Sequence, residues 1–360
     1  MNETPIIDLV EAQLREAPRR WLVTGGAGFI GSHLCEQLLV LGQSVVIVDN
    51  FDTGTRANVE ALVAAAAARG AADPGARLEV RELDVRDRDG LFGACEGIDH
   101  VLHEAAVASV PRTIADPAEG HAVNVDGTFH VIEAARAAGV RSLVHASSSA
   151  VYGDHPGDPE TGAQREDRIG RPLSPYGGHK HIAEILGQAT TRSFGLPITA
   201  LRYFNIVGAR QDPEGAYAAV IPKWVATLAK GEQPLIFGDG LNTRDFCPVE
   251  DVVQANLLAA LWPERRPAAE RERPGDPSDA VFNVGLGGAT SLLDLYELIH
   301  AGMVELGAPC VGVRPRHEDF RPGDIRHSRA DISRTRAQLG YAPRTSMAQA
   351  LRQTMQWLLR

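Results

Sequence analysis

Lysine, cysteine and aromatic residues are scarce in this chain of 360 residues, and aromatics make up only 6% of it. The four cysteines, Cys35, Cys95, Cys247 and Cys310, lie far apart and form no Cys-x-x-Cys pair, so neither a metal site nor a redox dithiol is indicated. No apolar run reaches the roughly 18 residues that a membrane span needs. The N-terminus lacks the basic and apolar stretches of a secretory signal. We therefore expect free thiols in a cytoplasmic protein without a membrane partner.

Positive charge is also in deficit, because 36 basic residues face 46 acidic ones and the net charge is −10. Such a chain gains little from phosphate electrostatics, so we expect no nucleic-acid partner. The 44% share of hydrophobic residues excludes global disorder. Only Lys180, Lys223 and Lys230 are lysines. Where arginine serves as the general cation, a retained lysine hints that an ammonium group is needed for itself.

Short apolar runs alternate with helical patterns along the first two hundred residues. Expected strands are Arg20–Thr24, Ser44–Asp49, Leu78–Asp84, His100–Glu104, Ser142–Ser147 and Ile198–Tyr203, and expected helices are Gly31–Leu41, Arg56–Arg69, His121–Ala138 and Pro175–Phe194. This alternation is typical of βαβ units. It predicts an α/β fold with a Rossmann-type, doubly wound parallel sheet.

The same patterns predict the organisation of the chain. Ile6, Ile7, Val10 and Leu14 recur at helical spacing, so residues 1–19 are expected to form an N-terminal helical extension. Residues 20–205 are the predicted nucleotide-binding domain. Glycine and proline become frequent in residues 206–360, which we expect to form a smaller α/β substrate domain. Segments near 244–262 and 281–290 are expected to return to the first domain.

A glycine-rich turn, Gly25–Gly31, lies between the first expected strand and helix with the spacing Gly-x-x-Gly-x-x-Gly. Such glycines let the backbone approach a pyrophosphate at a helix N-terminus. Asp49 ends the second strand, where a carboxylate accepts ribose hydroxyls and repels a 2′-phosphate, so NAD is favoured over NADP. Asp84 and Val85 follow the third strand, where related folds bracket the adenine. The alternatives are a glycine turn without a ligand and an ordinary strand-end turn.

Tyr176 and Lys180 stand four residues apart on an expected helix, and so share one face of it. The lysine ammonium is expected to lower the pKa of the phenol from about 10, and a bound NAD⁺ adds to this effect. Tyr176 then becomes a candidate general base, the alternative being a helical surface pair. Ser148 lies in a serine-rich turn at a strand end, where its hydroxyl can both donate and accept a proton.

Taken together, four motifs resemble the extended short-chain dehydrogenase/reductase family. They are Gly25–Gly31, the Ser147–Gly153 stretch SSSAVYG, the Tyr176/Lys180 pair, and the Arg202–Asn205 stretch RYFN. Within that family the chain is similar to the nucleotide-sugar 4-epimerases, and among them to the bacterial UDP-N-acetylglucosamine type of surface-polysaccharide synthesis. The resemblance runs from about Trp21 to the C-terminus.

The resemblance implies a role for each matching residue. Tyr176 would be the base, Lys180 its electrostatic partner and Ser148 the group that holds the sugar 4-hydroxyl. Tightly bound NAD would contact Gly25, Gly28, Phe29, Ile30, Gly31, Asp49, Asn50, Asp84, Val85, Ala105, Asn124, Tyr176, Lys180 and Tyr203. The UDP-sugar would contact Ser109, Ser148, Ser149, Asn205, Arg244, Arg321, Asp324 and Ser328.

Three of these implied roles are more specific. Asn124 would lie near the nicotinamide and hold Lys180 in position. Arg244 and Arg321 would neutralise the diphosphate, and Asp324 would contact the uridine. The resemblance also implies a homodimer, formed through a four-helix bundle of the helices around His121–Ala138 and Pro175–Phe194.

The motifs also narrow the reaction. Relatives that dehydrate the sugar carry Asp-Glu where this chain has Ser149 and Ala150, so C4 epimerisation through a 4-keto intermediate is expected. The small Ser328 stands where glucose-restricted relatives carry a tyrosine, which favours UDP-GlcNAc and UDP-GalNAc. Epimerisation of UDP-GlcNAcA/UDP-GalNAcA or of UDP-glucuronate stays open, as does an NAD-binding protein without activity.

Two departures from the family pattern stand out. The chain is longer than its relatives around Gly162–Arg165, which can alter access to the sugar. Gly177 and Gly178 follow the candidate base, and we expect them to loosen the start of that helix.

Overall fold

The computed structural model describes residues 4–212, 219–266, 280–320 and 326–359. A seven-stranded parallel sheet forms its centre, in the order β12-β7-β5-β4-β1-β2-β3. Its strands are β1 (Arg20–Thr24), β2 (Ser44–Asp49), β3 (Leu78–Glu82), β4 (His100–His103), β5 (Ser142–Ser148), β7 (Ile198–Tyr203) and β12 (Val281–Val284). The α/β fold with a parallel, Rossmann-type sheet is therefore confirmed.

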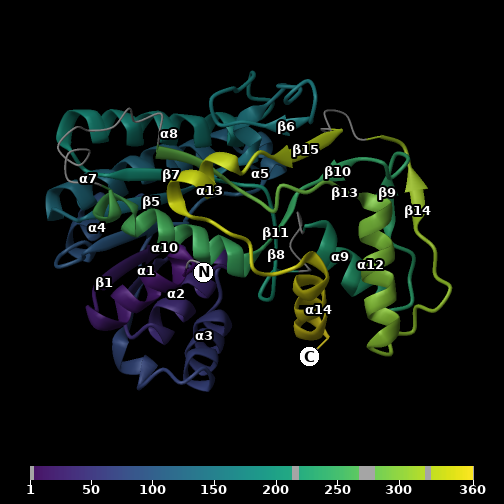
Figure 1. Cartoon of the computed structure of the whole chain (residues 1–360), viewed down its shortest axis with the longest axis horizontal. Helices are drawn as coiled ribbons and strands as arrows, with labels where there is room; N and C mark the ends of the chain where they lie inside the picture. Colours follow the sequence, from purple (N-terminus) through teal and green to yellow (C-terminus); the bar gives the residue numbers. More distant parts are fainter. Residues whose placement is uncertain (1–3, 213–218, 267–279, 321–325, 360) are drawn as a thin grey trace.

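Helices cover both faces of this sheet (Figure 1). One face carries α1 (Ile6–Glu16), α2 (Phe29–Val40), α3 (Arg56–Ala68) and α10 (Val249–Arg265), and the other carries α4 (Arg88–Ala94), α7 (Thr128–Ala138) and α8 (Pro175–Phe194). Along β1, Trp21 and Val23 join the first core and Leu22 joins the second. Burial on both faces explains why these strands read as continuous apolar runs.

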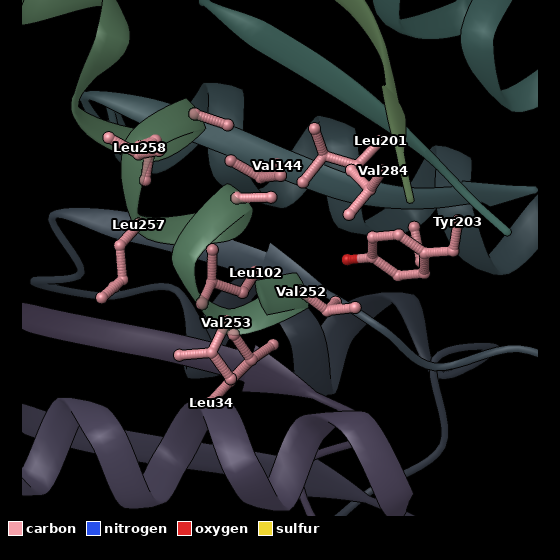
Figure 2. Close-up of a cluster of buried hydrophobic side chains, with 14 of the residues drawn as sticks. Leu34, Leu102, Val144, Leu201, Tyr203, Val252, Val253, Leu257, Leu258 and Val284 are labelled. Atoms are coloured by element: carbon pink, nitrogen blue, oxygen red, sulfur yellow. The ribbon is translucent and has the colours of Figure 1, made fainter. Parts of the chain in front are cut away.

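Helix α10 forms the centre of the first core (Figure 2). Its Val252 and Leu258 pack toward side chains of β4, β5, β7 and β12, and Val253 lies against Leu34 of α2. A segment more than two hundred residues from β1 thus supports the same sheet. This packing attaches the later part of the chain to the strand ends that carry the candidate site.

The N-terminal helix α1 belongs to the same core. Its Val10 and Leu14 are fully buried, as their helical spacing predicts. Just after the helix, the Arg19 guanidinium donates to both carboxylate oxygens of Glu264 on α10, at 2.6 and 2.8 Å. The extension is therefore packed into the domain and not merely laid on its surface.

The helix predicted over His121–Ala138 is interrupted. It consists of α6 (Pro117–His121), a π-helical turn η2 (Ala122–Gly127) and then α7, preceded by α5 (Val110–Ala115). The wider turn directs Asn124 into the interior. There its Oδ1 accepts the N–H of Val107 at 2.8 Å, and its Nδ2 donates to the carbonyl oxygen of Val107 at 3.0 Å. Single π turns of this kind are frequent at functional sites.

The remaining elements form a smaller α/β part with its own core, at the right of Figure 1. Its mixed sheet has the order β13-β10-β15-β6, from β13 (Thr290–Ser291), β10 (Thr243–Arg244), β15 (His327–Ala330) and β6 (Ala163–Gln164). Two short pairs join β8 (Asn205–Val207) to β11 (Phe246–Pro248) and β9 (Leu235–Phe237) to β14 (Arg316–Glu318). Its helices are α9 (Val220–Ala229), α12 (Leu292–Glu305) and α14 (Met347–Leu358). Helix α13 (Ser333–Leu339) packs instead on α10 and β12 of the first core. The short helical turns are η1 (Pro74–Arg77) and η3 (Ser149–Tyr152).

The stretch around Gly162–Arg165 takes part in this mixed sheet. Its strand β6 pairs with β15, the strand that carries Ser328. The two residues of β6 are thus an edge strand beside the candidate gate position.

Candidate active site

The glycine turn between β1 and α2 allows close backbone approach. Gly25 has φ +69°, and a Cβ there would lie 2.7 Å from the backbone nitrogen of Ala105. A Cβ on Gly31 would lie 2.2 Å from the carbonyl oxygen of Gly25. Gly28 directly precedes α2, and Phe29 and Ile30 form its first turn. The N-terminal N–H groups of α2 therefore begin at a turn that only glycines can form.

Asp49 fastens this turn to the end of β2. Its carboxylate accepts the backbone N–H of Ala27 at 2.9 Å and that of Phe51 at 2.8 Å, and burial raises its pKa. Next to it, Asn50 donates to Asp84 at 2.8 Å. The Arg86 guanidinium, which also donates to Asp84, lowers the pKa of that carboxyl to about 2. The predicted cofactor residues of the β2 and β3 ends are thus brought together.

Tyr176, in the first turn of α8, lies beside Ser148, whose hydroxyl lowers the pKa of the phenol. Ser148 ends β5, and its Oγ also accepts the N–H of Ala150 at 3.1 Å. A Cβ on Gly177 would lie 2.6 Å from the carbonyl oxygen of Ala150. That glycine lets the first turn of α8 lie against η3. The expected loosening is therefore replaced by a packing role, and Ser174 caps the helix through the N–H of Gly177 at 3.2 Å.

Lys180 lies one turn further along α8 and is buried. Its Nζ donates to the carbonyl oxygen of Ala146 at 2.8 Å and stands 5.9 Å from the centre of the Tyr176 ring. Burial lowers the pKa of this lysine to about 8, an effect opposed by the carboxylates of Glu104 and Glu184.

The pKa of Tyr176 differs from the prediction. Burial raises it to about 12, the hydrogen bond from Ser148 lowers it, and the charge of Glu104 raises it further. The expectation that Lys180 lowers this pKa is therefore wrong for the protein alone. The ammonium is directed at a backbone carbonyl and is not among the groups that shift the pKa of the phenol, which burial dominates.

Glu104 is a site residue that the sequence reasoning missed. It follows β4 directly, and its carboxylate accepts a hydrogen bond from Tyr203 Oη at 2.8 Å. Tyr203 Oη in turn accepts a hydrogen bond from Asn256 Nδ2 at 2.8 Å. Figure 2 shows the Tyr203 ring at the end of β7 with its hydroxyl directed into the interior. Burial raises the pKa of Glu104 to about 7. A charged residue ending the apolar run of a central strand was the available signal.

Three other predicted residues have contacts that bear on their roles. Asn124 bonds the backbone of Val107, while Lys180 bonds the carbonyl oxygen of Ala146, so the two residues are not joined directly; a place for Asn124 near the nicotinamide stays a prediction. Ala105 donates its N–H to Thr24 Oγ1 at 3.3 Å, beside Gly25. Val85 is buried and packs against Gly127 of the π turn.

The predicted sugar-side residues lie on several elements. Ser149 begins η3, and Ser109 caps α5 by accepting the N–H of Arg112 at 3.1 Å. Asn205 Nδ2 donates to the carbonyl oxygen of Asp245 at 3.1 Å, while Arg244 and Ser328 face each other across β10 and β15. Arg321 and Asp324 lie outside the described residues.

Asp245 is a second residue that sequence reasoning missed. Its carboxylate is buried and accepts the backbone N–H groups of Leu286, Gly287 and Ala330 at 2.9 to 3.1 Å. Burial raises its pKa to about 6. The side chain ties β10 to the loop after β12 and to β15, and so fixes the strand of Ser328.

The described residues contain no candidate metal centre: no three His, Cys, Asp or Glu side chains among them gather so that they could hold a metal ion. Within the same ranges, no helix has both the length and the apolar character needed to cross a membrane.

Comparison with known proteins gives consistent matches. The model of the NAD dependent epimerase/dehydratase family matches residues 21–285. The UDP-glucose 4-epimerase of Mycolicibacterium smegmatis is 36% identical, over 94% of this chain and 98% of that protein. The structure of UDP-N-acetylglucosamine 4-epimerase from Methanobrevibacter ruminantium with UDP-N-acetylmuramic acid matches with a TM-score of 0.81, 33% identity and coverage of 95% and 98%. The structure of UDP-glucose 4-epimerase from Thermotoga maritima with UDP-glucose matches with a TM-score of 0.79 and 31% identity, over 94% of this chain and 98% of that chain.

The buried carboxyl of Glu104 predicts a pH dependence of stability. Its pKa rises from 4.5 to about 7 on folding, so between these values the unfolded chain releases a proton that the folded chain keeps. The free energy of unfolding therefore falls as the pH rises through this range. Glu104→Gln retains an acceptor for Tyr203 but cannot titrate. As the pH rises through this range, we expect its free energy of unfolding to fall by less than that of the wild type. Urea unfolding at a series of pH values measures this.

Glu60→Gln is the matched control, because Glu60 is exposed on α3, and it should follow the wild type. Identical pH dependence of unfolding in Glu104→Gln and the wild type would contradict the assignment.

Proposed function

Since the chain belongs to the NAD dependent epimerase/dehydratase family, we propose that it inverts C4 of a UDP-sugar and prefers UDP-GlcNAc and UDP-GalNAc. The observation that carries the proposal is the position of Tyr176 beside Ser148, with the buried ammonium of Lys180 5.9 Å from the centre of the phenol ring. A serine, a phenol and a lysine so arranged can move a proton to and from a sugar hydroxyl. We assign the sugar-binding side chains to the smaller part, predicted as residues 206–360, together with Ser109, Ser148 and Ser149.

The residues around the glycine turn fit an NAD cofactor. The close contacts of Gly25 and Gly31 leave a backbone surface without side chains at the start of α2, which suits a pyrophosphate. Asp49 carries the carboxylate for the ribose hydroxyls, and its oxygens have lone pairs beyond those used by Ala27 and Phe51. When bound, NAD supplies a reversible hydride acceptor for C4. Because each cycle restores it, the cofactor can stay tightly bound.

Tyr176 handles the proton. With a pKa of about 12 in the protein alone, its phenol is protonated at neutral pH. It becomes a base only when positive charge lies beside it, which the oxidised nicotinamide carries and Lys180 reinforces. Ser148 lies beside the phenol, and we assign its hydroxyl the task of holding the sugar 4-hydroxyl for Tyr176. Glu104 limits how far the phenol pKa can fall.

The sugar preference rests on Ser328. It lies on β15 opposite Arg244 of β10, and β6 borders the same strand. A serine leaves space for an N-acetyl group, and Arg244 is the proposed ligand of the diphosphate. Both UDP-glucose and UDP-N-acetylglucosamine epimerases occur among the proteins similar to this chain, so substrate profiling decides between them.

The first test is catalytic. Protein purified without added cofactor is incubated separately with UDP-GlcNAc, UDP-Glc, UDP-GlcA and UDP-GlcNAcA, and products are identified by proton NMR. We expect UDP-GalNAc from UDP-GlcNAc, and a loss of kcat of at least about 100-fold in Tyr176→Phe because the base is removed. Tyr296→Phe, in the core of the smaller part, is the control and should stay active. Full activity of a folded Tyr176→Phe variant would refute the mechanism.

The second test concerns the gate. We expect Ser328→Tyr to lose conversion of UDP-GlcNAc while UDP-Glc is still converted, since the larger side chain fills the space beside the sugar 2-substituent. Relative kcat/KM values for the two substrates measure this. Ser333→Tyr on the exposed start of α13 serves as the control. If UDP-GlcNAc conversion is unchanged in Ser328→Tyr, the gate is elsewhere.

We also propose that the protein is a cytoplasmic homodimer joined through α7 and α8. Phe129 of α7 is 45% exposed, and Ile182 and Ile185 share a face of α8 with exposures of 38% and 50%. Exposed apolar side chains on neighbouring helices are suited to a partner surface. Light scattering should give the mass of two chains for the wild type and of one chain for Ile185→Arg. Leu298→Arg on α12 is the control, and a monomeric wild type would exclude the dimer.

A further inference from the structure

An ion pair joins a helix and a loop that lie on opposite sides of the glycine turn. Arg112 lies on α5, the helix that follows β4, and Asp52 lies in the loop that follows β2. Arg112 Nη1 donates to Asp52 Oδ2 at 2.6 Å. The same guanidinium donates through Nε to Glu119 of α6 at 2.9 Å, which fixes its direction. One arginine thus links segments 60 residues apart in the chain.

The order of the strands shows what this ion pair crosses. In the sheet, β1 lies between β4 and β2. All three strands are parallel, so their carboxyl ends meet at one edge. A bridge from the segment after β4 to the loop after β2 must therefore pass over the end of β1, where the turn Gly25–Gly31 begins.

The bridge continues toward β3 through hydrogen bonds. The Asp52 N–H donates to Asn50 Oδ1 at 3.1 Å, and Asn50 donates to Asp84 at 2.8 Å. Arg86 then bonds Asp84. Side chains that follow β4, β2 and β3 are in this way connected across the end of β1, where the glycine turn begins.

We propose that the Arg112–Asp52 ion pair is a strap across the cofactor groove, and that it slows the release of NAD. The proposal rests on the NAD assignment made above and adds Arg112 and Asp52 as positioning residues. Neither has a role in the chemistry of the sugar. The side chains are 29% and 48% exposed, so the pair is weak enough to open for loading and is made again once the groove is filled.

The test measures cofactor release and not turnover. Protein loaded with NADH is mixed with a large excess of NAD, and the loss of bound NADH fluorescence gives the release rate. We expect Asp52→Asn and Arg112→Gln each to release NADH about two- to fivefold faster than the wild type, the range that a partly exposed ion pair supports. The double variant should be no faster than either single variant, because both remove the same contact.

Glu82→Gln is the matched control. It removes a carboxylate from an exposed ion pair with Arg56, at 2.5 Å, that does not span β1, and it should release NADH at the wild-type rate. Wild-type rates in both strap variants, or effects that multiply in the double variant, would overturn the strap and leave the cofactor assignment intact. A wild type that binds no NADH would overturn the assignment and the strap together.

Discussion

The arrangement of the candidate site depends on a buried ion pair between Glu184 of α8 and Arg202 of β7. Two bonds of 2.8 Å join them, and Ser147 of β5 donates to the same carboxylate. With side chains only 2% and 4% exposed, loss of one partner would strand a buried charge, at a cost of about 3–5 kcal/mol. The pair therefore locks the helix of Tyr176 and Lys180 onto β7, and the bond from Ser147 holds the same helix against β5, the strand that ends at Ser148.

The charges around that framework keep the Tyr176 phenol protonated in the protein alone. Glu104 lies near both Lys180 and Tyr176, so the ammonium is partly neutralised before it acts on the phenol. Tyr176 keeps its proton in this state, and a further positive charge is required before it can act as a base. Under the proposed mechanism, oxidised NAD would bring that charge and reduced NAD would not, so Tyr176 would be the stronger base at the stage in which a hydroxyl proton has to be removed.

The parts of the fold and site that depend on local spacing could be predicted from the sequence. The bounds of β1, β2, β7 and α8 match the expected ones, and a pair four residues apart on α8 faces Ser148. Glu104 could not be assigned in this way, because its partner Tyr203 is 99 residues away and Asn256 lies 53 residues beyond that tyrosine. The contact of Asn124 could not be predicted for a similar reason, since a π turn, which helical periodicity does not reveal, directs its amide at Val107.

The segment that contains the edge strand β6 is held at both of its ends. Tyr152 Oη donates to Asn283 at 2.6 Å before β6, and Ser174 caps α8 after it. Between these anchors, Ala163 and Gln164 pair with β15, the strand of Ser328. If Ser328 sets the sugar as we propose, a change in this segment would reach the choice of substrate through β15, while Ser148 and Tyr176, which lie outside the two anchors, keep their positions.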